Sequence, residues 1–401
     1  MKKERMMMIM VFFLLFTLTG CWSRHELSDL AIAVALGIDK NEKEEFVVSV
    51  QIVNPGETAT SQTAGGYDTP ITTYTRKGET LFEALRKLST EVPRLLYLSQ
   101  LRIIVIGEEV AKEGIYDALD FLSRYHELRT DFYIIVAKER TAEDTIKILT
   151  AIEKIPANKL FFSLEKSAEV WAATEKITLT ELMDDIISEG TQPTLTGVTI
   201  KGDQKGGSTI KNLESISPLA TYNYQGIAAF HKNKLVGWLN KEESKGFKYI
   251  KDNVKSTVNV INMNGGKVGV ELVRTKTEII PHINNGTIMI EVKVSGEGNV
   301  GDVNTKLDLM DSSVIGEIES KVNKDIEKKI MATVERAQKD FQSDILGFGE
   351  RIHKTNPKVW EKVKKQWIDM FPTIPVNVDV HIKIRRIGTI TNPFHNDLKK
   401  E

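Results

Sequence analysis

Apolar and polar residues alternate in two different patterns along the chain. Up to about residue 190, short apolar runs that read as strands, such as Leu101 to Ile106 and Phe132 to Ala137, alternate with amphipathic segments that read as helices, such as Thr80 to Val92 and Ile115 to Leu128. An alternation of strands and helices is typical of a sheet covered by helices. We therefore expect an N-terminal α/β domain with a mixed sheet over residues 21–190.

From Ser256 the pattern changes to longer segments with side chains that alternate between apolar and polar. Three such strands are expected over residues 257–263, 268–280 and 287–294, joined by Asn-Gly turns. A long amphipathic helix follows from about Ser313 to about Asp344. Its apolar residues recur every three or four positions: Ile315, Ile318, Val322, Ile326, Ile330, Val334, Ala337 and Phe341. The pattern predicts a C-terminal domain, residues 256–401, with an antiparallel sheet beside this helix.

Between these parts lies a shorter stretch with its own strands and helix. A strand is expected over residues 193–201, a hairpin around His231-Lys232-Asn233 and a short helix from Glu242 to Ile250. We interpret residues 191–255 as a small middle domain. The predicted fold class is α/β (α+β), with three domains.

The first twenty residues have the pattern of a secretion signal. Residues 2–5 are mainly basic, and residues 6–18 are almost wholly apolar but too few to span a bilayer. The small residue Gly20 directly precedes Cys21, the only cysteine of the chain. This order predicts a lipoprotein signal peptide over residues 1–20, cleavage after Gly20, and a diacylglycerol thioether on Cys21. The alternative is a plain secretory signal followed by an unrelated cysteine.

Three tryptophans are candidates for contacts outside the chain. Trp22 follows the predicted lipid attachment site directly, and an indole ring suits the level of the lipid headgroups. Trp360 and Trp367 are seven residues apart and therefore share one face of a predicted helix. That face either packs in the core or forms a ridge that contacts a partner protein.

Charge and composition limit the classes of partner. The chain has 54 basic and 55 acidic residues, and loss of residues 1–20 would remove three basic residues and Glu4, leaving a net charge of −3. A near-neutral chain argues against nucleic acid as a partner and against adhesion to anionic lipid by charge. No later apolar run is long enough to cross a membrane, so the lipid on Cys21 is the expected anchor.

The sequence contains no pattern that predicts bond-making chemistry. Residues 296–301 match the G-x-G-x-x-G spacing, but no helix opens after them and two nearby carboxylates would repel a pyrophosphate, so a loop is expected there. The seven histidines are scattered, without metal-ligand spacing. We expect neither a cofactor nor a metal, and a protein that is not an enzyme.

Three stretches resemble one known family. Residues 21–30, Cys-Trp-Ser-Arg-His-Glu-Leu-Ser-Asp-Leu, are similar to the mature start of the Ger(x)C lipoproteins, although that family often has an acidic residue in place of Ser23. Residues 235–239 and 347–367, with Gly-Phe-Gly-Glu and Pro-Lys-Val-Trp, are similar to later parts of the same family. The resemblance covers essentially the whole chain.

This resemblance implies a structure and a role. The fold would be three α/β domains in an extended arrangement. The protein would be the C subunit of a nutrient germinant receptor of endospore-forming bacteria, acting with A-type and B-type integral-membrane subunits on the outer face of the spore inner membrane. Whether this subunit itself contacts the small nutrient stays open.

Two other functions are compatible with a lipid anchor. A solute-binding lipoprotein of a membrane transporter would need two similar α/β lobes, and the two halves of this chain are patterned differently. A tethered enzyme such as a cell-wall hydrolase would need paired carboxylates or a metal set, which the sequence does not offer.

Overall fold

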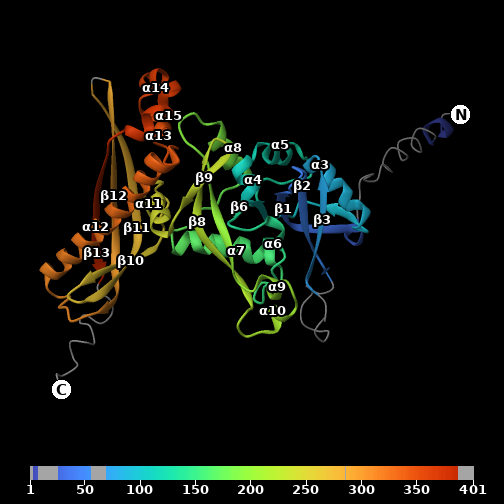
Figure 1. The fold of residues 1–401 in the computed structure, drawn as a ribbon, viewed down its shortest axis with the longest axis horizontal. Helices are drawn as coiled ribbons and strands as arrows, with labels where there is room; N and C mark the ends of the chain where they lie inside the picture. Colours follow the sequence, from blue (N-terminus) through green and yellow to red (C-terminus); the bar gives the residue numbers. More distant parts are fainter. Residues whose placement is uncertain (1–2, 8–25, 56–68, 285, 387–401) are drawn as a thin grey trace.

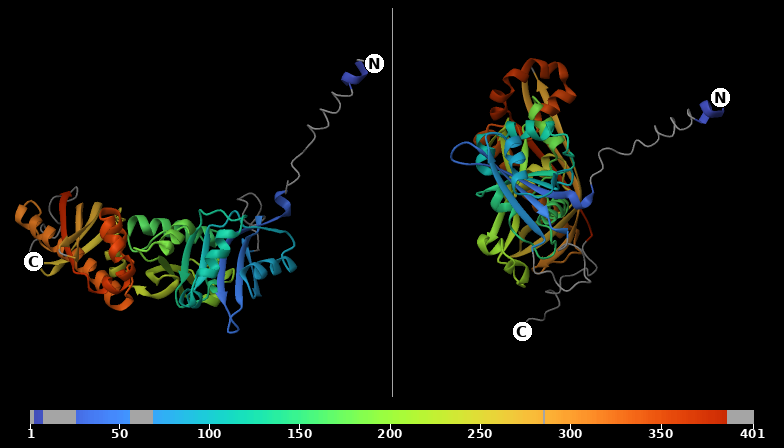
Figure 2. Two further views of the ribbon diagram at one scale, coloured as in Figure 1. Left: turned by 90° about the horizontal axis from the view of Figure 1, so that it is seen from above. Right: turned by 90° about the vertical axis from the view of Figure 1, so that its right-hand side faces the viewer.

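The computed structural model describes residues 3–7, 26–55, 69–284 and 286–386. Gly20, Cys21 and Trp22 lie outside these ranges, so the predictions for cleavage, lipid attachment and the membrane interface stay predictions. Figures 1 and 2 show an elongated molecule with two sheets placed one after the other along its long axis. The first described strands lie at one end and the C-terminal sheet at the other.

The larger sheet is mixed and, within the described residues, has nine strands. Their order is β3-β2-β1-β5-β6-β7-β8-β9, with β4 beside β1. The strands from β1 through β5 and β6 to β7 pair in parallel, and the outer pairs on both sides are antiparallel. The bounds are β1 Leu30–Lys40, β2 Phe46–Val53, β3 Ile71–Gly78, β4 Leu95–Tyr97, β5 Ile103–Gly107, β6 Tyr133–Ala137, β7 Thr194–Gly202, β8 Ala220–His231 and β9 Lys234–Leu239.

Helices cover both faces of this sheet, as its central strands require. Successive residues of β5 point to opposite faces, so Ile104 packs into one core cluster and Ile103 into another. Both are fully buried, as expected for parallel strands covered on two sides. The helices are α3 Leu81–Lys87, α4 Glu108–Glu113, α5 Tyr116–Arg124, α6 Ala142–Ile146, α7 Pro156–Val170, α8 Leu179–Ile187, α9 Gln204–Gly207, α10 Lys211–Glu214 and α11 Lys241–Ile250.

The predicted middle domain needs a correction. Residues 191–255 were expected to form a separate unit, but β7 pairs in parallel with β6 through Ile135↔Thr196, and β8 and β9 extend the same sheet. These strands therefore belong to the larger sheet. The other face of β8 and β9 contributes Ile227 and Leu239 to the core of the C-terminal part. The mixed α/β class with a second, C-terminal sheet is confirmed.

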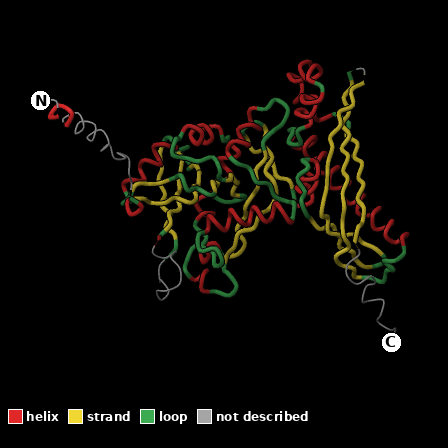
Figure 3. The backbone as a smooth tube through the Cα atoms, turned by 180° about the vertical axis from the view of Figure 1, so that it is seen from behind, coloured by secondary structure: helices red, strands yellow, loops and turns green. Residues whose placement is uncertain are grey.

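The long strands of the C-terminal sheet are drawn in yellow in Figure 3, and their order is β10-β11-β12-β13. Its strands are β10 Thr257–Met263, β11 Gly266–Asn284, β12 Thr287–Asn304 and β13 Val376–Arg386. The turn between β10 and β11 is confirmed: Asn264 and Gly265 have φ angles of 48° and 76°, as a two-residue turn of type I′ requires. Residues 296–301, expected as a loop, lie within β12 instead.

The expectation of a purely antiparallel C-terminal sheet is wrong for its last strand. β13 pairs in parallel with β12, beginning at Ile290↔Val376. A helical crossover carries the chain back across the sheet before β13 begins, which a parallel pairing needs. The crossover consists of α12 Ser312–Glu335, the π-helical η3 Arg336–Phe341, α13 Phe348–Thr355, α14 Pro357–Val363, η4 Lys364–Gln366, α15 Trp367–Met370 and η5 Phe371–Thr373.

The predicted apolar stripe on the long helix is confirmed. Ile318, Val322, Ile326 and Ile330 are fully buried in the core cluster shared with the C-terminal sheet. The regular helix ends earlier than expected, because residues 336–341 form a π-helical turn and Gln342 takes a left-handed φ of 48°.

The same helix also protects the open edge of β13. Asn323 Oδ1 accepts a hydrogen bond from the Ile382 N–H at 2.9 Å, and Glu319 Oε1 accepts one from the Ile384 N–H at 2.9 Å. Among the described strands β13 has a neighbour only on its β12 side, and an unpaired edge invites pairing with another chain. Side chains of α12 therefore accept hydrogen bonds from N–H groups of β13 that do not pair with β12.

The carboxylate of Asp344 organises the turn between η3 and α13. Oδ1 accepts hydrogen bonds from the N–H groups of Gly347 at 2.8 Å and Phe348 at 3.1 Å, and Oδ2 accepts from the Gly349 N–H at 2.8 Å and from Trp367 Nε1 at 2.9 Å. Burial raises the pKa of Asp344, and the hydrogen bonds from Gly349, Phe348 and Trp367 act in the opposite direction. Four N–H donors meet the two oxygens, which offsets part of the cost of burying the carboxyl group.

Trp360 and Trp367 are buried, with 1% and 2% of their surface exposed. Their rings meet edge to face with centroids 5.5 Å apart. Of the two alternatives for these candidate contact residues, core packing describes this structure, because both side chains point into the core. The single helical face expected for them is not present, since Trp360 lies on α14 and Trp367 on α15.

Replacing Phe341 with aspartate is expected to destabilise the C-terminal part. The ring is buried and packs on Gly237 of β9, so Phe341→Asp removes a large apolar group and buries a charge. We expect the free energy of unfolding to fall by about 4 kcal/mol, measured by urea titration. Met331→Asp, at a 39% exposed position of α12, serves as the control. An unchanged midpoint for Phe341→Asp would mean that the stripe faces elsewhere.

Replacing Asp344 with asparagine tests the turn itself. Asn has one acceptor oxygen, and its NH₂ group would face two of the N–H donors that Asp344 now accepts from. We expect a loss of about 3 kcal/mol in the free energy of unfolding, together with a change in tryptophan fluorescence, since Trp367 loses its acceptor. Asp340→Asn, at an exposed ion pair with Arg336, should cost less than about 0.5 kcal/mol. Equal stability of the two variants would contradict the role given to Asp344.

Candidate functional site

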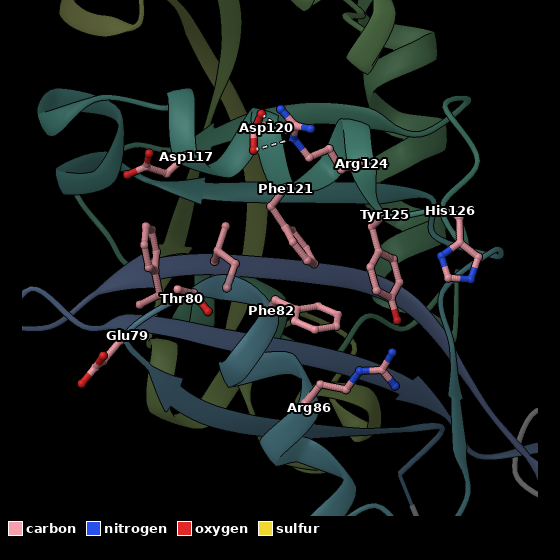
Figure 4. Close-up of a pocket in the computed structure, with 12 residues that line it drawn as sticks. Glu79, Thr80, Phe82, Arg86, Asp117, Asp120, Phe121, Arg124, Tyr125 and His126 are labelled. Atoms are coloured by element: carbon pink, nitrogen blue, oxygen red, sulfur yellow. Dashed lines mark hydrogen bonds and ion pairs between the residues drawn. The ribbon is translucent and has the colours of Figure 1, made fainter.

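The main candidate site is a groove between α3 and α5, with a volume of about 660 Å³. We call it the aromatic groove (Figure 4). The residues that give it its character are Glu79, Phe82, Arg86, Asp117, Phe121 and Tyr125.

The helices present these residues because their other faces cover the sheet. On α3, Leu81 and Leu85 are buried, while Phe82 and Arg86 lie four residues apart on the outer side. Glu79 directly precedes Thr80, which caps α3 by accepting a hydrogen bond from the Glu83 N–H at 3.1 Å.

The second wall of the groove is built in the same way. On α5, Ala118, Leu119 and Leu122 are buried. Asp117, Phe121 and Tyr125 follow at intervals of four residues, and they line the groove from this side. Two amphipathic helices thus place their aromatic residues against each other above the sheet.

Three aromatic rings form the middle of the groove. Ring centroids are 6.4 Å apart for Phe82 and Phe121, 6.1 Å for Phe82 and Tyr125, and 5.4 Å for Phe121 and Tyr125. Burial raises the pKa of the Tyr125 hydroxyl, and the nearby Glu127 carboxylate raises it further, so the hydroxyl stays neutral. Phe82 nevertheless keeps 48% of its surface exposed.

Charged groups stand at the two ends of the groove. Figure 4 shows Glu79 and Asp117 at one end, and Arg86 near Tyr125 and His126 at the other. The Arg86 guanidinium carbon is 5.0 Å from the centroid of the Phe82 ring, within the range of a cation–π contact. This arrangement separates negative from positive charge along an aromatic surface.

Most of these charges lack a partner. Arg124 is paired, since its Nε donates to Asp120 Oδ1 at 2.8 Å. By contrast, the side chains of Arg86, Glu79 and Asp117 make no hydrogen bond or ion pair with any other residue that the structure describes. The groove can therefore bind a group that is apolar in the middle and oppositely charged at its ends.

A second hollow, of about 460 Å³, lies at the carboxyl ends of β1, β5 and β6. Its lining includes the buried carboxyl group of Asp39, whose pKa burial raises to about 6. Asp39 Oδ1 and Oδ2 accept hydrogen bonds from the N–H groups of Ala142 at 2.8 Å and Glu143 at 2.9 Å. Asp39 therefore holds the start of α6, which is a structural role.

Two further kinds of feature, metal-ligand clusters and membrane-spanning helices, were sought in the described residues. No cluster of three or more potential metal ligands occurs among the residues that the structure describes. None of the helices in those ranges is both long enough and apolar enough to cross a bilayer.

The aromatic groove is a feature that the sequence did not predict. Its two walls lie in segments that were expected only as amphipathic helices, Thr80 to Val92 and Ile115 to Leu128. A usable signal was present, because Phe82 and Arg86, like Phe121 and Tyr125, repeat at intervals of four on the side away from the leucines.

Two family models match most of the chain. The model described as "Spore germination protein N-terminal domain" matches residues 23–200, and the model described as "Spore germination B3/ GerAC like, C-terminal" matches residues 225–388. The second match begins in β8, the strand whose residues join the C-terminal core.

Curated relatives and a solved structure agree with these matches. Spore germination protein KC of Bacillus subtilis (strain 168) is 34% identical over 410 residues, which covers 100% of both chains. Spore germination protein B3 of the same organism is 24% identical over 384 residues, covering 95% of this chain and 97% of the relative. The crystal structure of the GerBC protein has the same fold, with a TM-score of 0.53 at 18% identity over 87% of this chain and 96% of that one.

The resemblance seen in residues 21–30, 235–239 and 347–367 is thereby confirmed. The matches run from the first of these stretches to the last, and they include both sheets. The chain belongs to the Ger(x)C family of spore germination proteins.

Proposed function

We propose that this chain is the lipid-anchored C subunit of a nutrient germinant receptor and acts in the initiation of spore germination. The observation that carries the proposal is the 34% identity to Spore germination protein KC along the whole length of both chains. Similarity that extends over both sheets and the connecting turn supports a shared role as well as a shared fold.

The anchor in this proposal is the lipid on Cys21. Cleavage after Gly20 makes Cys21 the new N-terminus, and two or more acyl chains hold a protein on a membrane where one chain would bind only marginally. Trp22 would then lie at the level of the headgroups. The finding that no described helix could span a membrane is compatible with attachment by lipid.

The partners in this proposal are the A-type and B-type integral-membrane subunits. The lipid holds the chain on the outer face of the spore inner membrane, and the folded part docks on the extramembrane surfaces of these subunits. The subunit is non-enzymatic: it holds or signals within the complex. Its two sheets differ in size and topology, which does not favour the two similar lobes of a transporter's solute-binding lipoprotein.

Replacing Cys21 with alanine tests the anchor. We expect Cys21→Ala to release the chain from washed membranes and to abolish germination through this receptor, because no acyl chain can be attached. Membrane fractions are compared by immunoblot, and the mass of the N-terminal peptide reports lipidation. Ser23→Ala, two residues away, should stay lipidated and active. Retention of Cys21→Ala in washed membranes would contradict the proposal.

A further inference from the structure

The aromatic groove has the composition of a protein-binding surface. Phe82, Phe121 and Tyr125 meet in its middle, Arg86 and Arg124 line it, and no lysine does. Aromatic residues and arginine are enriched in the centres of protein interfaces, and lysine is depleted there. The groove therefore has the anchors on which binding energy is usually concentrated.

Its shape favours a chain segment over a small molecule. Small-molecule pockets bury most of their ligand, whereas this groove lies between two surface helices, and Phe82 in its middle is 48% exposed. An amphipathic helix that lays one face into such a groove is a common mode of peptide recognition.

The charges define the occupant further. Arg86 at one end has no acidic partner, and Glu79 and Asp117 at the other end have no basic partner among the described residues. A complementary segment carries apolar residues on one face, a carboxylate where it passes Arg86, and a basic side chain where it passes Asp117. Charges matched in this way fix the direction in which the segment lies.

We propose that the aromatic groove binds an amphipathic helical segment of an integral-membrane receptor subunit, with its acidic end at Arg86 and its basic end at Asp117 and Glu79. This inference rests on the proposed function, and it names the surface of this chain at which docking occurs.

The place of the groove in the molecule supports this assignment. Figures 1 and 2 show α3 and α5 in the same half of the molecule as β1, which begins at Leu30. Glu26 is five residues from Cys21, a length of chain that spans at most roughly 17 Å. A lipid on Cys21 would hold this half nearest the membrane, within reach of extramembrane segments of a membrane subunit.

Edges of the C-terminal sheet offer less for a partner to bind. Besides the side chains that occupy donors of β13, Lys245 Nζ donates to the Val258 carbonyl at 3.1 Å and Lys321 Nζ donates to the Asn262 carbonyl at 3.1 Å, both in the edge strand β10. Lys245 belongs to α11 and Lys321 to α12, and covering an edge strand with a helix is a recognised protection against strand pairing. The aromatic groove is not protected in this way.

The test uses full-length lipoprotein in spore membranes, captured after solubilisation, with the receptor subunits identified in the captured material. We expect Phe82→Ala and Arg86→Glu each to lower recovery of an A-type or B-type subunit at least about tenfold, as loss of an interface anchor does. Both variants should remain lipidated and fold normally, because both side chains lie outside the core.

Matched controls lie outside the groove. Phe162→Ala replaces a 42% exposed ring on α7, and Arg129→Glu replaces an exposed arginine that pairs with Asp131. Both should leave recovery of the subunits unchanged. An equal fall for the controls and the groove variants would overturn the proposal.

Cross-linking locates the contact directly. A photoreactive phenylalanine analogue at position 82 should form a product with an identified A-type or B-type subunit, and the same analogue at position 162 should not. If the wild-type chain captures no such subunit, the proposed function fails. If the wild-type chain captures these subunits and the groove variants capture them equally well, only the assignment of the groove fails. The same conclusion holds if the groove variants capture the subunits normally and change only the response to nutrient.

Discussion

The buried carboxylate of Asp344 is the contact on which the arrangement of the two sheets depends. Three of its four hydrogen bonds, from the N–H groups of residues 347–349, fold residues 344–349 into a tight turn, and this turn lies against Gly190. The Glu350 N–H donates to the Gly190 carbonyl at 2.7 Å, and the Gln192 N–H donates to the Asp344 carbonyl at 2.9 Å. A Cβ at Gly190 would collide with this backbone, so the close approach needs glycine. The turn thereby ties the start of β7 to the long helix.

Apolar side chains also pack between the two sheets beside this turn. Ile227 and Leu239 of the larger sheet share one core cluster with Val334 and Phe341 of the helical crossover. Ser343 Oγ also donates to the Phe230 carbonyl at 2.7 Å. Close-packed protein interiors resist continuous deformation. The two sheets therefore behave as one body, although the pattern of the sequence divides them.

Local signals predicted local structure well. The three- and four-residue spacing of the long helix and the Asn-Gly turn at 264–265 each depend on neighbours within a few residues. The assignment of β7 to the larger sheet and the parallel direction of β13 depend on pairings over tens of residues, which no local pattern encodes.

The candidate site divides in the same way: Gly20, Cys21 and Trp22 form a local motif, whereas the aromatic groove exists only because two helices far apart in sequence meet. Trp360 and Trp367 were ambiguous for that reason, since a shared helical face says nothing about what covers it.

Because the turn at residues 344–349 connects the two sheets, binding in the aromatic groove also affects the position of the C-terminal sheet. If an integral-membrane subunit occupies the aromatic groove, it fixes the orientation of α3 and α5, and these helices are packed on the larger sheet through buried leucines. That sheet is held rigidly against the C-terminal sheet by the turn at residues 344–349. Binding at the anchored end therefore also fixes the direction of the far end, where polar and charged side chains such as Lys293, Asp379 and His381 line the β12–β13 pair. A rigid elongated subunit of this kind holds two separate surfaces at a constant spacing, which a flexible chain of domains could not do without losing conformational entropy on each contact.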